Sequence, residues 1–375
     1  MIYLDSAATS LQKPQSVSQS VSRAIKTLAS PGRGCYRPAM QAADCVVDCR
    51  MALASYFGVD EPENVIFTFN ATHALNIAIN SLVSFGDRVV ISGYEHNSVL
   101  RPLYAAGADI CIVRTPLFQP ETMLESFERE LRWAKCAVCT HVSNVFGYVL
   151  PIRKIASLCR ERGVPLIIDA SQSAGVLPID NSVLGAAFIA MPGHKGLLGP
   201  QGTGVLLCNH ETRPLMHGGT GSNSSEVLMP DYLPERLEAG THNVAGIAGL
   251  YQGLKFIASK DRHCIADHER RLKDALASQL SVIDGLRVFS TNVPSLQTGV
   301  LSVLHESIGA DELAEQLGKR GICVRAGLHC SPLAHETCGT AEEGTLRFSF
   351  SPFNTLREVH MAGEAMKKII NNIAK

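Results

Sequence analysis

Short apolar runs and amphipathic stretches alternate along the first two thirds of the chain. The runs are rich in valine and isoleucine, and most are followed by a stretch with apolar residues at helical spacing. This alternation predicts an α/β fold, in which helices cover both faces of a mainly parallel sheet. The expected strands are residues 64–68, 88–92, 137–142, 165–169 and 186–190, and the expected helices are residues 72–83, 98–106 and 155–162.

The pattern changes after about residue 250 and predicts a smaller α+β domain. Its expected elements are helices at 261–283 and 310–319 and strands at 286–289, 300–303, 322–325 and 345–350. Thr355 and Glu358 open a final helix with the spacing of a capping box. We therefore expect an N-terminal segment (1–15) that joins the small domain or the cleft, a large ligand-binding domain (16–250) and a small C-terminal domain (251–375).

The chain carries 34 basic and 35 acidic residues and has no basic run. This balance argues against binding to nucleic acid or to an anionic membrane, and small, neutral-to-anionic substrates fit better. No apolar stretch is long enough to cross a bilayer, and the first residues lack the pattern of a secretory signal. We therefore expect a cytoplasmic protein.

Twelve cysteines do not form a disulfide framework in a chain of 375 residues, so most should be small buried residues in a reducing compartment. Cys136 and Cys139 form a lone CxxC motif within an expected strand. Residues three apart on a strand point to opposite faces, so the two thiols cannot chelate one metal ion. We expect no metal site here.

Lys195 and Asp169 lie where an α/β sheet binds its ligands, at or beyond the carboxyl ends of strands. Asp169 ends an apolar strand, and Lys195 lies in a glycine-rich turn after the next strand. A lysine that forms a Schiff base and an acid that pairs with a pyridinium nitrogen are the groups that hold pyridoxal phosphate. The pair therefore predicts an enzyme with this cofactor.

Other interpretations of the two residues exist. Asp169 is followed by Ser171 and Gln172, and this arrangement fits a helix N-cap about equally well. The glycine-rich turn around Lys195 has some likeness to a nucleotide-binding loop. However, the chain has no GxxxxGK[ST] motif and no strand followed by GxGxxG, so the nucleotide interpretation has little support.

Thr72 and His96 each follow an expected strand. Backbone N–H groups around Thr72, together with its hydroxyl, are placed to hold a phosphate at a helix N-terminus, although an ordinary N-cap threonine fits the same pattern. His96 is placed to stack on a planar cofactor, although a lone loop histidine is more often simply exposed. The order of phosphate loop, histidine, aspartate and lysine is more specific than any one of these residues.

These residues resemble the cysteine desulfurase and selenocysteine lyase-like group of the aminotransferase class V superfamily, which are fold-type I pyridoxal-phosphate enzymes. The resemblance spans nearly the whole chain in the expected order. It implies a mainly parallel, seven-stranded-type sheet in the large domain and a smaller α+β domain that carries Cys330. The matching segments are residues 3–9, 95–97, 141–147, 169–172, 193–195, 238–241 and 325–330.

The resemblance implies a role for each residue around the cofactor, pyridoxal 5'-phosphate. Lys195 would form the Schiff base and Asp169 would pair with the ring nitrogen. Gln172 would donate to the ring oxygen, and His96 would stack on the ring and help to move protons. The implied phosphate ligands are Thr72, His194 and, from the neighbouring subunit of a homodimer, Thr241.

The chain departs from the family pattern at two positions near the phosphate. The family often has a serine two residues before the histidine of the lysine turn, whereas this chain has Pro192, which has no hydroxyl to donate. Ala71 stands beside Thr72 where a hydroxyl residue is common, so backbone N–H groups would replace it.

The resemblance also implies how the substrate is held and where its sulfur goes. Asn144 and Arg347 would grip the substrate carboxylate, a task that suits the planar guanidinium fork of arginine. Cys330 would accept the sulfur of L-cysteine as a persulfide, and alanine would leave; L-selenocysteine is a further candidate substrate. His329 and Arg325 are expected to favour the Cys330 thiolate. A sulfur-acceptor protein is a further expected partner.

Several alternatives stay open from the sequence. A selenocysteine lyase would use the same residues, and a class V aminotransferase would need Lys195, Asp169 and Arg347 but no cysteine. A non-enzymatic sulfur-carrier scaffold is less favoured, because Lys195 and Asp169 are both present. Cys338 is either a relay thiol or, more in line with its pattern, a structural cysteine.

Overall fold

The computed structural model describes every residue except 33, 223, 262 and 374–375. Its main sheet has seven strands in the order β2-β8-β7-β6-β5-β3-β4. Strand β8 runs antiparallel to both of its neighbours, and the remaining pairs are parallel. The strands are β2 (Val65–Thr68), β3 (Arg88–Ser92), β4 (Asp109–Val113), β5 (Cys136–Thr140), β6 (Leu166–Asp169), β7 (Phe188–Pro192) and β8 (Gly204–Cys208).

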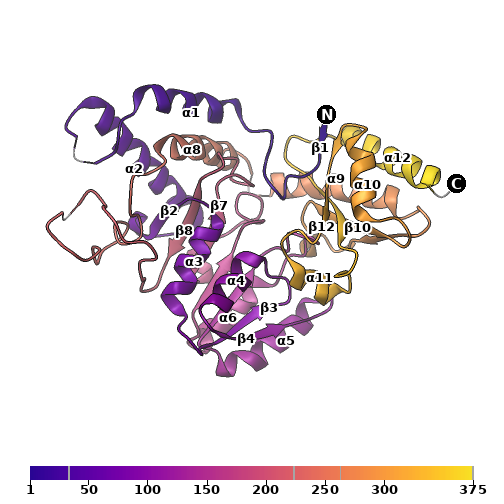
Figure 1. Cartoon of the computed structure of the whole chain (residues 1–375), viewed down its shortest axis with the longest axis horizontal. Helices are drawn as coiled ribbons and strands as arrows, with labels where there is room; N and C mark the ends of the chain where they lie inside the picture. The colour runs from indigo at the N-terminus through magenta and orange to yellow at the C-terminus, as the bar shows by residue number, and fades with distance from the viewer. Residues whose placement is uncertain (33, 223, 262, 374–375) are drawn as a thin grey trace.

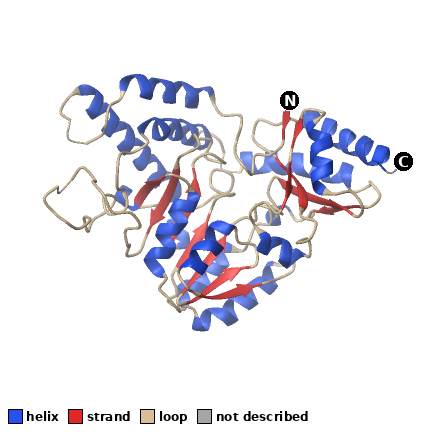
Figure 2. Cartoon of the chain, viewed as in Figure 1, coloured by secondary structure: helices blue, strands red, loops and turns tan. Residues whose placement is uncertain are grey.

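Helices pack on both sides of this sheet (Figure 2). Neighbouring strand residues enter different apolar clusters, as Ile167 and Ile168 do, because successive side chains of a strand point to opposite faces. Cys136 and Cys139 also lie in different clusters, as expected for the two cysteines of the CxxC motif. The helices are α1 (Gln15–Thr27), α2 (Arg37–Phe57), α3 (Ala71–Leu82), α4 (Asn97–Ala105), α5 (Pro120–Glu130), α6 (Ile152–Glu161), α7 (Asn181–Leu184) and α8 (Val244–Ala258).

A second, antiparallel sheet has the strand order β12-β13-β10-β9 and its own apolar cluster (Figure 1). The last helix begins with the expected capping box: Thr355 N–H donates to Glu358 Oε2 at 2.8 Å, and Glu358 N–H donates to Thr355 Oγ1 at 3.3 Å. The elements are α9 (Cys264–Leu280), β9 (Leu286–Phe289), β10 (Val300–His305), α10 (Ala310–Gly318), β12 (Arg325–Gly327), α11 (Pro332–Cys338), β13 (Thr345–Ser349) and α12 (Leu356–Ile373).

The N-terminal segment connects the two sheets. Strand β1 (Ile2–Tyr3) pairs in parallel with β11 (Ile322–Cys323), and Asp5 forms a bridge with Ser349. The chain then passes toward the turn after β7, where Ser10 N–H donates to the carbonyl of His194 at 3.0 Å. Residues close to the N-terminus therefore lie beside the turn that carries Lys195.

The expected elements are present with boundaries that differ by a few residues, and one expected strand is different. Residues 322–325 do not form one strand: β11 pairs with β1, whereas β12 pairs with β13 in another sheet. An extended segment can pair with one strand and, a residue later, with a strand of another sheet. The pattern of apolar and polar residues does not show this change of pairing. The alternation also did not reveal α1, α2, β4, α5, β8 or α8.

In the described part of the chain, no helix combines the length and apolarity that a membrane crossing requires. The cysteines of the same residues form no disulfide bond. No group of three or more metal-binding side chains was found among them.

A buried ion pair ties α2 to the edge of the main sheet. The guanidinium of Arg50 donates to both carboxylate oxygens of Glu238, at 2.9 and 2.8 Å, and Phe67 N–H on β2 donates to the same carboxylate at 2.7 Å. Both side chains are less than a tenth exposed. Glu238 therefore anchors the segment that leads to Thr241.

We predict that Glu238→Ala lowers the free energy of unfolding by about 3–5 kcal/mol, because it leaves the guanidinium of Arg50 buried without its counter-charge. Urea denaturation at equilibrium measures this change. Glu343→Ala is the control, since that side chain is exposed, and its effect should stay within about 0.5 kcal/mol. Equal stability of the two variants would contradict the prediction.

Candidate active site

A cavity of about 100 Å³ lies at the carboxyl ends of β5, β6 and β7. It brings together most of the residues that the sequence singled out. A larger cavity of about 660 Å³ is lined by residues such as Val149, Leu177 and Pro294 and contains none of the expected site residues. The smaller cavity is lined by, among others, Thr72, His96, Asn144, Asp169, Gln172, His194 and Lys195.

Lys195 lies in a tight turn directly after β7. Gly193 N–H donates to the carbonyl of Thr203 at 2.8 Å, and Leu198 N–H donates to the carbonyl of Lys195 at 2.9 Å. A Cβ atom at Gly193 would lie 2.1 Å from Thr203 Oγ1, so the turn requires glycine there. Burial lowers the pKa of Lys195 to about 8, against the opposing effect of the Asp169 carboxylate. A neutral, nucleophilic amine is therefore accessible near neutral pH.

Asp169 ends β6 and is only 3% exposed. Its Oδ1 accepts a hydrogen bond from Ser171 N–H at 2.8 Å. The following residues form turns and not a helix, so the helix N-cap interpretation is wrong. Burial lowers the pKa of both Lys195 and His96, and the Asp169 carboxylate partly opposes this lowering. The cavity therefore holds a buried negative charge.

His96 is the N-cap residue of α4 and is partly buried, so it is not simply an exposed loop histidine. Its Nδ1 accepts a hydrogen bond from Ser98 N–H at 3.0 Å. This bond assigns the proton of the neutral ring to Nε2. Burial, aided by Lys195, Arg101 and Arg347, lowers the pKa of His96 to about 4. The imidazole is therefore neutral at pH 7.

Thr72 lies in the first turn of α3, but it is not the N-cap. Asn70 caps this helix, with its Oδ1 accepting from His73 N–H at 2.9 Å, so the N-cap interpretation of Thr72 is wrong. The first N–H groups of any helix lack intrahelical partners and suit a phosphate. Ser98, which the sequence reasoning missed, lies 2.9 Å from the Thr72 hydroxyl and also lines the cavity. The signal for Ser98 was a hydroxyl residue two positions after His96.

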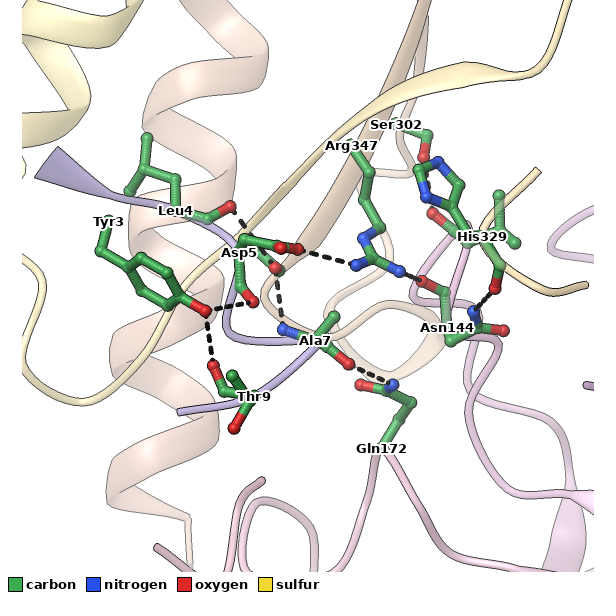
Figure 3. Close-up of polar contacts among 12 residues, drawn as sticks. Tyr3, Leu4, Asp5, Ala7, Thr9, Asn144, Gln172, Ser302, His329 and Arg347 are labelled. Carbon is green, nitrogen blue, oxygen red and sulfur yellow. Dashed lines mark hydrogen bonds and ion pairs between the residues drawn. The ribbon is translucent and has the colours of Figure 1, made fainter. Parts of the chain in front are cut away.

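The N-terminal segment is bonded to two residues that line the cavity. The Gln172 amide donates to the carbonyl of Ala7 at 3.0 Å (Figure 3), and His194 Nδ1 lies 3.0 Å from Thr9 Oγ1. Burial, together with the nearby lysines Lys195 and Lys13, lowers the pKa of His194 to about 4, so this ring is neutral at pH 7. The segment 1–15 was expected at the small domain or the cleft, but these individual contacts were not predicted.

Arg347 lies on β13 and is 2% exposed. Its Nη2 forms an ion pair with Asp5 at 2.9 Å, and its Nη1 donates to the Asn144 carbonyl at 2.9 Å (Figure 3). Its Nε has no hydrogen-bond partner among the described residues. An unpaired buried N–H group is costly, and Arg347 is not among the residues that line the cavity.

Cys330 lies in the loop between β12 and α11 and is exposed, outside the residues that line the cavity. The loop is nevertheless bonded to the rim. Asn97 N–H, beside His96, donates to the Cys330 carbonyl at 2.9 Å, and the Asn144 amide donates to the His329 carbonyl at 2.8 Å. Both His329 and Cys330 have positive φ angles, 51° and 57°.

His329 does not help the thiolate as expected. Its ring is buried, and its Nε2 lies 3.1 Å from the carbonyl of Thr345. Burial, together with Arg347 and His335, lowers the pKa of His329 to about 2. The ring therefore carries no positive charge at neutral pH, and the expectation that it favours the thiolate of Cys330 is wrong.

Two residues of interest lie away from the cavity. Cys338 is packed beside Tyr94, and burial raises the pKa of its thiol to about 11, which favours the structural interpretation over a relay thiol. Thr241 is exposed and lines a different cavity, which it shares with Phe67 and His73.

The side chains around the cavity fit pyridoxal phosphate. A lysine with a lowered pKa suits a Schiff base, and a buried carboxylate beside it suits a pyridinium nitrogen. The N-terminus of α3 and two hydroxyl groups suit a phosphate. Neutral imidazole and amide groups line the same cavity.

Comparisons with known proteins agree with this chemistry. The family model described as aminotransferase class-V matches residues 2–361. A probable cysteine desulfurase of Methanothermobacter thermautotrophicus is 32% identical over 385 residues, which cover 98% of this chain and 94% of that relative. A probable cysteine desulfurase of Vibrio cholerae is 31% identical, and the match covers 99% of this chain and 94% of that relative.

Solved structures give the same result. The apo structure of the cysteine desulfurase from Thermococcus onnurineus NA1 has a TM-score of 0.92 at 28% identity, and the match covers 99% of this chain and 95% of that chain. The predicted fold is thereby confirmed, with its mostly parallel seven-stranded sheet. The chain belongs to the aminotransferase class-V family of pyridoxal-phosphate-dependent enzymes, in its cysteine desulfurase-like group.

Proposed function

We propose that this protein is a cysteine desulfurase that converts L-cysteine to L-alanine and transfers the sulfur to Cys330. One observation carries the proposal. The loop of Cys330 is bonded to Asn97 and Asn144, at the rim of the cavity that contains Lys195, Asp169 and His96. A thiol at this rim is needed by a desulfurase and not by an aminotransferase.

Six side chains and the N-terminus of α3 would hold the cofactor. Lys195 would bind it covalently, the Asp169 carboxylate would keep a proton on its ring nitrogen, and Gln172 and His96 would contact its ring. Thr72 and His194 would hold its phosphate, together with the N–H groups of α3. When bound, pyridoxal phosphate supplies an electron sink for negative charge at the substrate Cα.

Residues of this chain would remove the Cα proton and bind the substrate. Released from the cofactor, the neutral amine of Lys195 would remove the Cα proton, since burial lowers its pKa to about 8. The Nε N–H of Arg347 would bind the substrate carboxylate. The side-chain amide of Asn144 would bind the same carboxylate with its second N–H, because the first donates to the His329 carbonyl.

Sulfur transfer then occurs at Cys330. The Cys330 thiolate attacks the substrate sulfur, and an S–S bond forms as the Cβ–S bond breaks. The electron pair of the broken bond stays with the substrate carbon skeleton, which takes up protons and leaves as alanine. The thiol and L-cysteine therefore give one persulfide and one L-alanine, with no external oxidant.

The exposure of Cys330 supports a further step, in which a sulfur-acceptor protein takes the sulfur from the persulfide. The absence of disulfides among the described cysteines supports a reducing compartment, and we propose the cytoplasm.

We also propose the domain ranges 1–15, 16–250 and 251–375. The separate apolar cluster of β9, β10, β13 and α12 supports the small domain.

We further propose a homodimer in which Thr241 completes the phosphate site of the partner subunit. Within one chain Thr72 is exposed and Thr241 lies outside the cavity of Lys195, so the phosphate end of the site is open. Met40, Val47 and Met51 are each more than half exposed, and their spacing of seven and four places them on one face of α2. Such an apolar stripe suits a subunit interface.

The first prediction of the proposed function concerns the thiol. Cys330→Ala should lower the rate of alanine release from L-cysteine at least about a hundredfold, because the sulfur loses its nucleophilic acceptor. Alanine is measured under reducing conditions, and bound cofactor is checked by absorbance. Cys264→Ala is the control, since this exposed cysteine begins α9 and should leave activity unchanged.

Two other results would redirect the assignment. Alanine release from L-selenocysteine alone by the wild type would identify a selenocysteine lyase. If the wild type releases no alanine from either substrate, but its cofactor changes to the amine form and a 2-oxo acid is consumed, the protein is an aminotransferase.

The second prediction concerns the pKa of Lys195, about 8 in the folded protein. Only the neutral amine reacts with acetic anhydride, so acetylation of Lys195 in cofactor-free protein should rise with pH and reach half its maximum near pH 8. Peptide mass spectrometry measures the modification, with the exposed Lys26 as internal reference. A half-maximum above pH 10, near the ordinary lysine value, would contradict the role of burial.

The third prediction concerns the dimer. Lys195→Ala and Thr241→Ala should each be inactive or weak alone, whereas their mixture, after exchange of subunits, should regain about a quarter of wild-type activity, because half of the dimers then carry one intact site. No recovery in a mixture shown by mass to contain the mixed dimer would place Thr241 in the site of its own chain.

A further inference from the structure

Ser331 directly follows Cys330 and is fully buried. Its hydroxyl makes one hydrogen bond. Ser331 Oγ donates to Asn144 Oδ1 at 2.6 Å. The other end of the same amide donates to the His329 carbonyl at 2.8 Å. One side chain, Asn144, is therefore bonded to the residues on both sides of Cys330.

The conformation of this loop needs such support. Non-glycine residues rarely adopt positive φ angles, yet His329 and Cys330 both do so in succession. A backbone of this kind persists where the surroundings hold it in place. Here the surroundings are the two bonds to Asn144 and the bond from Asn97 N–H to the Cys330 carbonyl.

The hydroxyl of Ser331 also holds the oxygen end of the amide. An asparagine amide can turn over, which exchanges its oxygen and its NH₂ group. The His329 carbonyl can only accept, so it fixes the NH₂ group toward His329 and Oδ1 toward Ser331, whose hydroxyl donates to that oxygen. One N–H of this group then remains for a carboxylate in the cavity that Asn144 lines.

We propose that Ser331 is a positioning residue for sulfur transfer. By its hydrogen bond to Asn144, it holds the Cys330 loop at a defined position relative to the carboxylate of the bound amino acid. This role rests on the proposed desulfurase function and extends it to a residue that does not itself contact the reacting atoms. Ser331 acts on the transfer of sulfur from substrate to thiol. It does not act on the removal of the Cα proton by Lys195.

The two steps can be measured separately in the holoenzyme. Exchange of the Cα proton of L-alanine with D₂O reports on Lys195 and needs no thiol. Persulfide formation in a single turnover with L-cysteine reports on the loop. Ser331→Ala removes the hydroxyl and Ser331→Thr keeps it. Ser81→Ala is the matched control, because it removes another buried serine hydroxyl, which donates to the Ile77 carbonyl within α3.

We expect Ser331→Ala to slow persulfide formation about tenfold or more, because small misplacements of reacting groups reduce rates steeply. Its Cα exchange should stay within about twofold of the wild type, as should both rates of Ser81→Ala. Ser331→Thr should recover persulfide formation to within about threefold, since it retains the donor to Asn144.

Three results would overturn the role. Unchanged persulfide formation in Ser331→Ala would show that the hydroxyl is dispensable. An equal loss of exchange and transfer would show a general structural effect, and failure of Ser331→Thr would show that the hydroxyl is not the relevant group. If the wild type exchanges the Cα proton and forms no persulfide, the desulfurase function itself fails, and the role of Ser331 fails with it.

Discussion

The site depends on one buried cation, the guanidinium of Arg347. It is 2% exposed on β13, and it bonds to Asp5 in the N-terminal segment and to the backbone of Asn144 after β5. An arginine keeps its charge when buried, so it needs polar partners, and its two partners come from two distant parts of the sequence. The second sheet, the N-terminal segment and the main sheet therefore meet at this point (Figure 3).

The groups around the cavity differ in charge, and each charge state suits a different role. Asp169 is held at the end of β6, where its negative charge is buried beside Lys195. The nearby histidines His96 and His194 stay neutral at pH 7, because burial lowers the pKa of each to about 4. A neutral imidazole can stack on a cofactor or share a proton without competing with the ring nitrogen for the carboxylate. The lowered pKa of Lys195 follows from the same burial.

The sequence predicted the parts of this site that depend on local pattern. Asp169 and Lys195 follow apolar strands, and parallel strands bring their carboxyl ends to one edge, so both residues could be placed before the structure was known. Asp5, Ser98 and Ser331 could not be found in this way. Their partners are set by the packing of distant segments, which no spacing rule records.

Burial was the other property that the sequence did not reveal. His329 next to Cys330 suggested a positive charge beside the thiol, but the ring is packed against β13 and neutral. Position next to a reactive residue says little about the direction of a side chain, which depends on the backbone. In this loop the backbone has two successive positive φ angles, and the residues around Cys330 are therefore directed differently from those of a strand.

The same backbone explains why the thiol loop depends on contacts outside its own sheet. Two residues in the left-handed region disfavour the turn by about 1–3 kcal/mol each, so this backbone persists only because the surrounding contacts offset that cost. The surroundings here are Asn97 at the start of α4 and Asn144 after β5, both from the main sheet and its helices. The position of Cys330 is therefore fixed by the elements that form the cofactor cavity. The contacts that pack the two sheets together therefore also place the thiol. Arg347 and Asn144 make the hydrogen bonds that connect them.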